Sequence, residues 1–117
     1  MNNEKTRIIQ ELVPGKQITI AHIIANPDEI LYQKLGLDPA KEHSGAIGIV
    51  TMSPSETAII AGDIAIKTSG AELGFVDRFS GTLIVTGTVS QVEEALESVC
   101  GYCREKLKFT VCEITKT

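Results

Sequence analysis

The sequence predicts an α+β fold, an α/β sandwich in which helices pack on one mixed, mostly antiparallel sheet. Extended apolar runs alternate with segments of helical periodicity, and several of these runs are joined by tight turns. A chain of 117 residues with 43% hydrophobic residues is long enough to bury one core, and no linker divides it. The 4% aromatic content and the absence of Trp predict a core of Ile, Val, Leu and Ala.

The strands are assigned from runs rich in Ile, Val and Thr and from their boundaries. The nearly continuous apolar run from Gly45 to Thr51 predicts a central strand that is covered on both faces. Pro14-Gly15 suits a type II turn, and Phe79-Ser80-Gly81 is typical of a hairpin tip in which Gly81 takes a positive φ. The expected strands cover residues 7–12, 17–24, 45–51, 71–78, 82–88 and 107–115.

The helices are assigned from their first and last residues. Asn26 is expected to cap a short helix that Gly36 ends, and 37–44 to form a polar loop. Ser53 and Glu56 predict a capping box for a second helix that runs to about Lys67. Thr88 or Ser90 is expected to cap the third helix. Its apolar stripe consists of Val92, Ala95, Leu96, Val99 and Cys103.

Charge and the N-terminal sequence exclude two classes of partner. The net charge is −4, the pI is near 5.1, and the longest basic stretch, 104–108, contains an acid and is typical of a helix end. We therefore expect no nucleic-acid binding. Met1 is followed by polar residues rather than an apolar segment, so we expect no membrane partner and a cytoplasmic location.

Cys100-Gly101-Tyr102-Cys103 has the spacing of a redox dithiol or of half a zinc site. Reactive thiols favour a helix N-terminus, where the dipole stabilises the thiolate, but this motif falls near the C-terminal end of the last helix. Cys112 does not complete a second ligand pair. The pattern therefore favours packed cysteines, and a thiol oxidoreductase remains an alternative hypothesis.

The remaining polar residues predict no catalytic, metal or cofactor site. His22 lies in a strand and is expected to be packed or hydrogen-bonded, whereas His43 lies in a polar loop. Glu93 and Glu94 are adjacent on the outer side of a helix and do not converge on one substrate atom. Gly45 to Gly48 lacks the strand, turn and helix order of a dinucleotide-binding motif.

Two positions suggest contacts with other molecules. Lys67 ends its helix, where it either complements the helix dipole or meets another subunit. Arg78, Phe79, Ser80 and Gly81 place a cation and an aromatic ring at a hairpin tip. An exposed aromatic side chain is costly unless a partner covers it, so this loop either packs on its own domain, contacts a subunit or lines an axial opening.

A larger pattern resembles one known family. The run 45–96 has the order strand, helix ending in Lys, hairpin and helix, and is similar to the core of bacterial microcompartment shell proteins: GAIGIVTMSPSETAIIAGDIAIKTSGAELGFVDRFSGTLIVTGTVSQVEEAL. In the usual members a further strand and short helix follow this core, but here a similar segment, ITIAHIIANPDEILYQKLG, precedes it. With the flanks RIIQELVPGKQ and LKFTVCEITKT, the chain resembles the circularly permuted shell proteins of ethanolamine- and propanediol-utilisation microcompartments.

The resemblance implies a structural, non-enzymatic protein without cofactors. It implies a homohexamer that associates with other shell proteins around metabolic enzymes, with Arg78 to Gly81 around the axis and Lys67 at the contact between hexamers. The usual Pro-Arg motif beside that contact appears here as Asn26-Pro27-Asp28. The N-terminal strand is expected to join its symmetry copies in a β-barrel that caps the axis. The barrel residues are Ile8, Ile9, Gln10, Glu11 and Leu12.

The expected organisation is an N-terminal barrel strand over 1–16 followed by one permuted domain over 17–117. A further hypothesis is that the barrel binds a targeting helix of an encapsulated enzyme. A small metabolite-binding sensor of similar architecture is the main alternative function.

Overall fold

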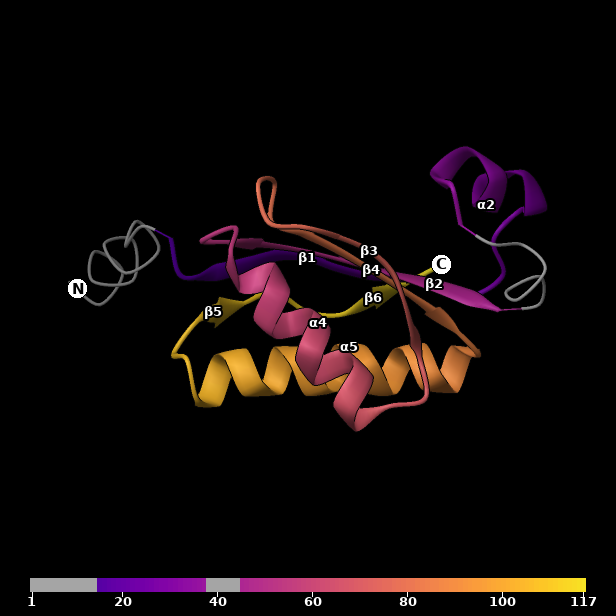
Figure 1. The fold of residues 1–117 in the computed structure, drawn as a ribbon. Helices are drawn as coiled ribbons and strands as arrows, with labels where there is room; N and C mark the ends of the chain where they lie inside the picture. The colour runs from indigo at the N-terminus through magenta and orange to yellow at the C-terminus, as the bar shows by residue number, and fades with distance from the viewer. Residues whose placement is uncertain (1–14, 38–44) are drawn as a thin grey trace, which may run out of the picture.

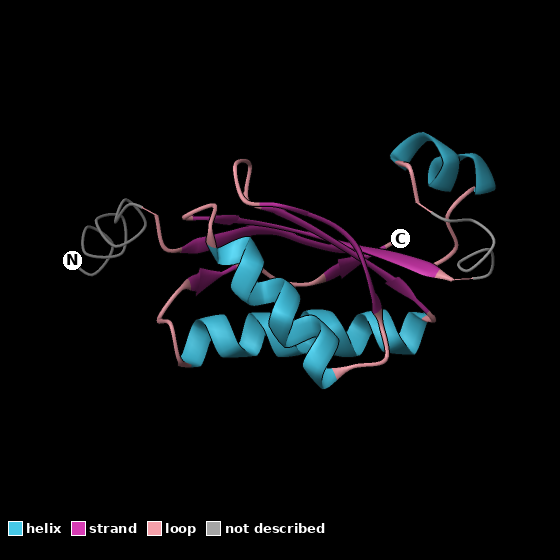
Figure 2. Ribbon diagram, viewed as in Figure 1, coloured by secondary structure: helices cyan, strands magenta, loops and turns pink. Residues whose placement is uncertain are grey.

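A computed structural model of the chain describes residues 15–37 and 45–117 and confirms the α+β class (Figure 2). Outside the described residues lie the expected strand at 7–12 with its barrel residues, as well as Pro14 and His43. The elements in chain order are β1 (Gln17–Ile24), α2 (Glu29–Leu35), β2 (Ala46–Ser53), α4 (Thr57–Thr68), β3 (Glu72–Asp77), β4 (Thr82–Gly87), α5 (Val89–Glu105), β5 (Thr110–Val111) and β6 (Thr115–Lys116).

The strands form one sheet in the order β3-β4-β2-β1-β5, with β6 also paired to β1. Neighbours among the first four strands are antiparallel, whereas the short β5 and β6 run parallel to β1. The run from Gly45 therefore forms a central strand, as predicted. Strand β1 precedes β2 in sequence yet lies between β2 and the C-terminal segment, so the sheet joins the two ends of the described chain.

Helices α4 and α5 cover one face of this sheet, and α2 covers part of the other (Figure 1). Helices α4 and α5 pack on the face that carries Val50, Met52, Leu83 and Val85 in the main core. On the opposite face, Tyr32 of α2 packs with Leu37, Ile47 and Ile84 in a smaller core, and its hydroxyl donates to the Gly45 carbonyl at 2.7 Å. Helix α2 covers only one end of that face.

Helix α5 follows the sequence prediction closely. The Thr88 hydroxyl accepts from the Gln91 N–H at 3.1 Å, and the Gln91 side chain accepts from the Thr88 N–H at 2.9 Å. This reciprocal pair satisfies two N–H groups that the helix itself leaves without partners. The predicted stripe is fully buried: Val92, Ala95, Leu96, Val99 and Cys103 are each 0% exposed.

The predicted capping box at Ser53 is wrong. Ser53 pairs with Gln17 as the last residue of β2, so α4 begins only at Thr57 and its cap residue, Glu56, makes no side-chain cap. The N–H groups of Thr57 and Ala58 instead bond the carbonyls three residues before them, at 3.0 Å each. Strand pairing thus extends β2 through the predicted cap. The end of α4, one residue after Lys67, agrees with the prediction.

Two further boundaries differ from the predictions. The cap of α2 is Asp28 rather than Asn26, because the Asp28 carboxylate accepts from the Ile30 N–H at 3.0 Å. Gly36 ends this helix with φ 75°, as expected. The strand expected over 107–115 is two short pieces, and it begins only at Thr110, because Phe109 turns into the core and its N–H bonds the Cys103 carbonyl at 2.9 Å.

Candidate functional site

The hairpin tip is a tightly hydrogen-bonded loop built around Asp77. The Asp77 carboxylate accepts from the Phe79 N–H at 2.9 Å and from the Ser80 hydroxyl at 2.8 Å. These donors, the Phe79 N–H first, lower the pKa of the Asp77 carboxyl because they stabilise its charged form. Gly81 has φ 76°, and a Cβ there would collide with the Met52 carbonyl, so this turn requires glycine. The loop is therefore held in one shape.

This loop presents Phe79 to solvent. The Phe79 side chain is 80% exposed, and the Arg78 guanidinium lies 4.9 Å from the centroid of its ring. A cation over an aromatic face is a favourable contact, but it leaves the other face of the ring uncovered. Within the described subunit, then, the tip does not pack back on its own domain. Figure 1 shows it rising above the sheet, whereas α4 ends below it.

Lys67 lies in the last turn of α4 and is also exposed. Its Nζ lies 2.9 Å from Asp63 Oδ2 one turn earlier, with 71% and 57% of the two side chains accessible. An exposed pair of this kind contributes little to stability. The long side chain is therefore free to contact a neighbouring molecule.

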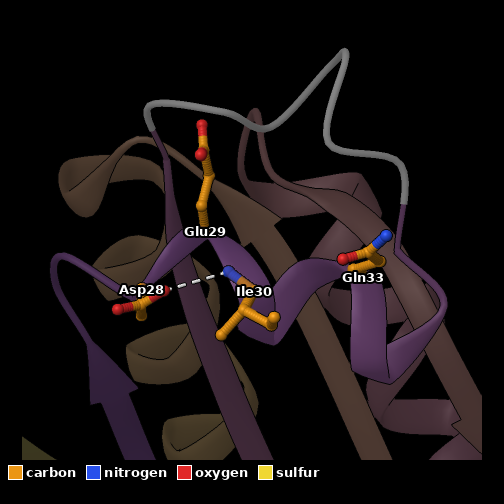
Figure 3. A pocket seen from close by; sticks show the side chains of 4 residues that line it. All are labelled: Asp28, Glu29, Ile30 and Gln33. Carbon is orange, nitrogen blue, oxygen red and sulfur yellow. Dashed lines mark hydrogen bonds between the residues drawn. The ribbon is translucent and has the colours of Figure 1, made fainter.

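Helix α2 forms a shallow acidic groove (Figure 3). Asp28, Glu29, Ile30 and Gln33 line a space of about 410 Å³, and Ile30 is 54% exposed. Among residues 15–37 and 45–117 no group of three His, Cys, Asp or Glu side chains could hold a metal ion. The groove includes Asp28 of the Asn26-Pro27-Asp28 segment.

The cysteines have the properties of packed rather than reactive thiols. Cys100 and Cys103 are buried and free. Burial raises the pKa of the Cys100 thiol from 9.0 to about 11, and burial also raises the pKa of Cys103. Both are protonated at neutral pH, and a protonated thiol is a poor nucleophile. The structure thus favours the packed interpretation of this motif over the oxidoreductase.

His22 is hydrogen-bonded, as expected. Its Nδ1 lies 2.6 Å from the Thr115 hydroxyl and its Nε2 lies 2.9 Å from the Thr117 hydroxyl. Both contacts join β1 to the C-terminal segment. His22 therefore helps to fix the outer edge of the sheet rather than to carry out chemistry.

In the described parts of the chain, no helix is both long and apolar enough to cross a membrane.

A group of exposed apolar side chains that was not predicted from the sequence lies at the β3 edge of the sheet. Ile59 and Ile66 of α4 are 52% and 44% exposed, and Leu73 and Phe75 of β3 are 47% and 46% exposed. Their exposure depends on β3 being the outermost strand, which a single sequence does not reveal. The apolar residues at 73, 75 and 76, on both faces of one strand, were the available signal.

Comparison with known proteins identifies the family. The model of the BMC domain matches residues 46–115. The chain belongs to the bacterial microcompartment shell proteins. The matched region starts at β2, so β1 and α2, which complete the sheet and the smaller core, precede the domain in sequence, as in a circular permutation.

Its relatives are similar over almost their whole length. The microcompartment shell protein EutS of Salmonella typhimurium is 54% identical over 113 residues, which cover 97% of this chain and 98% of EutS. The shell protein PduU of the same organism is 54% identical over 111 residues, covering 95% and 93%. A solved flat hexamer of CutR has a TM-score of 0.83 at 49% identity, covering 95% of this chain and 99% of that one. These relatives are structural shell proteins rather than enzymes.

Proposed function

We propose that this protein is a structural subunit of a bacterial microcompartment shell in the bacterial cytoplasm, and that it assembles as a homohexamer beside other shell proteins. The observation that carries the proposal is the similarity to the flat CutR hexamer along nearly the whole chain. The EutS and PduU relatives favour a shell around enzymes of ethanolamine, propanediol or related amine and diol degradation.

In such a hexamer, the tip from Arg78 to Gly81 surrounds the axis. Two properties support this placement: the loop is rigid, and its aromatic side chain is uncovered in the single subunit. Six copies of Phe79 would place bulky apolar rings together at the axis. We therefore expect a narrow axial opening.

Lys67 then lies at the contact between neighbouring hexamers. Its exposure and its place in the last turn of α4 support this role. Asp28, which follows Pro27 where the resemblance implies an arginine, and Glu29 beside it add acidic groups next to this contact.

The N-terminal segment completes the proposal. Residues 1–16 would supply a strand, from Ile8 to Leu12, to an axial β-barrel, and 17–117 would form the permuted domain. The rim of that barrel would bind a targeting helix from an encapsulated enzyme. Deletion of residues 1–13 tests this step, because unchanged binding to every cargo enzyme would contradict it.

Light scattering followed by electron microscopy tests the shell function. The protein should have the mass of six subunits, and its hexamers should associate side by side into extended two-dimensional protein sheets. Lys67→Ala should keep the hexamer and lose the sheets, whereas Lys106→Ala, which removes an exposed lysine at the end of α5, should keep both. Sheets from Lys67→Ala equal to those of the natural protein would contradict the assigned contact. A monomer with no larger assembly at any concentration would contradict the shell function.

A further inference from the structure

The C-terminal segment brings a third cysteine, Cys112, back along the last helix. Two contacts fix how this segment lies on α5. The Phe109 N–H bonds the Cys103 carbonyl near the end of the helix at 2.9 Å, and further on Lys116 forms an ion pair with Glu93 near its start. The segment therefore runs antiparallel to α5, as Figure 1 shows for β5 and β6. Cys112 lies between these two contacts, nearer the first, and so opposite the helical turn that precedes Cys103.

That turn of α5 carries Cys100. Cys100 is 2% exposed in the main core, and Cys112 is partly buried and packs against the same core. The electrostatics agree with this placement. Burial is the first cause of the raised pKa of the Cys100 thiol, and the negative charge of a Cys112 thiolate is the second, ahead of the charge of Cys103. Because such an effect weakens with distance, Cys112 lies at least as near to Cys100 as Cys103 does on the same helix.

Cys112 differs from the other two cysteines in reaching solvent. A groove of about 390 Å³ opens along β1, and Cys112 lines it together with His22 and Glu113. Hydrogen peroxide is little larger than water and fits such a space. Exposure is one of the properties that make a thiol susceptible to oxidation, and a second thiol close behind it can then form a disulfide. Cys112 and Cys100 have these two properties, one each.

We propose that Cys112 and Cys100 form a reversible disulfide within one subunit when the protein meets a hydroperoxide. This inference goes beyond the proposed function and does not depend on it. It also differs from the CxxC hypothesis, because both cysteines of that motif are buried and neither lines the groove.

The reaction has two steps. First the Cys112 sulfur, as its thiolate, attacks one oxygen of the peroxide. The O–O bond breaks, the second oxygen leaves as hydroxide and takes up the thiol proton as water, and Cys112 becomes a sulfenic acid. Then the Cys100 sulfur attacks the Cys112 sulfur, the S–O bond breaks, and the hydroxyl leaves with the Cys100 proton as a second water. The two thiols together lose two electrons, and the peroxide gains them.

The new bond would join α5 covalently to the outer edge of the sheet. In the reduced protein, two short strands, β5 and β6, pair the C-terminal segment with β1. A cross-link stabilises a folded protein mainly by restricting the unfolded chain. The peroxide-treated protein should therefore melt at a higher temperature than the reduced protein, and dithiothreitol should reverse the shift.

Peptide mapping tests which cysteines are joined. The natural protein is treated with hydrogen peroxide, its remaining thiols are blocked with N-ethylmaleimide after denaturation, and it is digested without reductant. Trypsin, which cuts after Lys and Arg, leaves Cys100 and Cys103 in the fragment 79–104 and Cys112 in the fragment 109–116. The two fragments should be recovered as one disulfide-linked species, and only one of the three thiols should take up the blocking reagent.

Three alanine variants identify the partner of Cys112. Cys103→Ala should still give the linked fragments, whereas Cys100→Ala and Cys112→Ala should not. Cys112→Ala should also lose the peroxide-dependent rise in melting temperature. Circular dichroism identifies any variant that fails to fold. Because Cys112 is only partly buried, its variant keeps the test decisive if a variant at a core position unfolds.

Four results would overturn the proposal. They are an unchanged number of free thiols after peroxide treatment, a bond confined to the fragment 79–104, a bond between two chains on a non-reducing gel, and oxidation of Cys112 to a sulfinic acid without any link. Loss of the linked fragments in folded Cys103→Ala would likewise assign the bond to the wrong cysteine. None of these results changes the subunit number in light scattering, so the shell function is judged separately.

Discussion

Gly48 provides a direct test of how closely α5 packs on the sheet. A Cβ at this position would lie 2.7 Å from Val92 Cγ1, 2.8 Å from Leu96 Cδ1 and 3.0 Å from Val85 Cγ2. Carbon atoms normally approach to about 3.5–4.0 Å, so Gly48→Ala forces α5 or its side chains to move. Overpacking of this kind costs about 1–3 kcal/mol. The loss of chain entropy in the unfolded state offsets about 0.4–1 kcal/mol of that cost.

We therefore expect Gly48→Ala to lower the free energy of unfolding by about 1–2 kcal/mol, measured by urea denaturation. Protomer concentration must be held constant, because association adds to apparent stability. Gly101→Ala is the matched control: apart from its chain neighbours and the backbone of its own helix, nothing lies within 4 Å of the point where its Cβ would stand, and alanine is the better helix former by about 0.8–1 kcal/mol. It should stabilise the protein.

A double variant shows whether the collision with Val92 causes the loss of stability. In a Val92→Ala background the nearest collision partner is shortened, so Gly48→Ala should cost less than in the natural protein. If Gly48→Ala is as stable as the natural protein, or if its cost is unchanged by Val92→Ala, the close packing of α5 on β2 is wrong.

Three other changes have defined outcomes. Thr88→Ala removes the cap of α5 and should cost about 1 kcal/mol in urea denaturation, whereas Ser90→Ala in the first turn should cost less; equal costs would contradict the capping box. Cys103→Ser buries a hydroxyl on the core stripe and should cost about 1–3 kcal/mol, and a variant as stable as the natural protein would place Cys103 outside the core. The pKa of the Cys100 thiol is raised in the folded state, so the contribution of this thiol to the free energy of unfolding is complete below pH 9 and is lost as pH rises toward 11. The stability of Cys100→Ala should therefore fall less over that range than the stability of the natural protein. Equal pH profiles for the two proteins would refute the burial of the Cys100 thiol.

Much of the fold could be predicted because local patterns and tertiary packing agree. The stripe in α5 and its Thr88 cap are both local, and the apolar run of β2 is continuous because helices cover it on one side and α2 partly covers the other. The Phe79-Ser80-Gly81 turn needs only a positive φ at glycine.

Two of the misassigned boundaries depend on tertiary contacts that the local sequence does not show. Ser53 has the character of a cap, but pairing with Gln17 keeps it in β2. The C-terminal run is rich in β-branched residues, but burial of Phe109 in the core delays its strand to Thr110, and the run pairs with β1 only in two separate pieces, β5 and β6. The same limit applies to the site: Lys67 and the hairpin tip were visible as local patterns, whereas the apolar side chains at the β3 edge are exposed only because the strand order leaves β3 outermost.

The permuted order also has a consequence during synthesis. Strand β1 leaves the ribosome well before its partners in the C-terminal segment, since His22 and its contact Thr117 are 95 residues apart. Until then the outer edge of β1, including Ile20, is uncovered in a nascent chain, and unpaired edges at this stage promote wrong association. Slow translation of the last third of the chain should therefore lengthen the period in which neighbouring nascent chains on one messenger RNA can pair incorrectly.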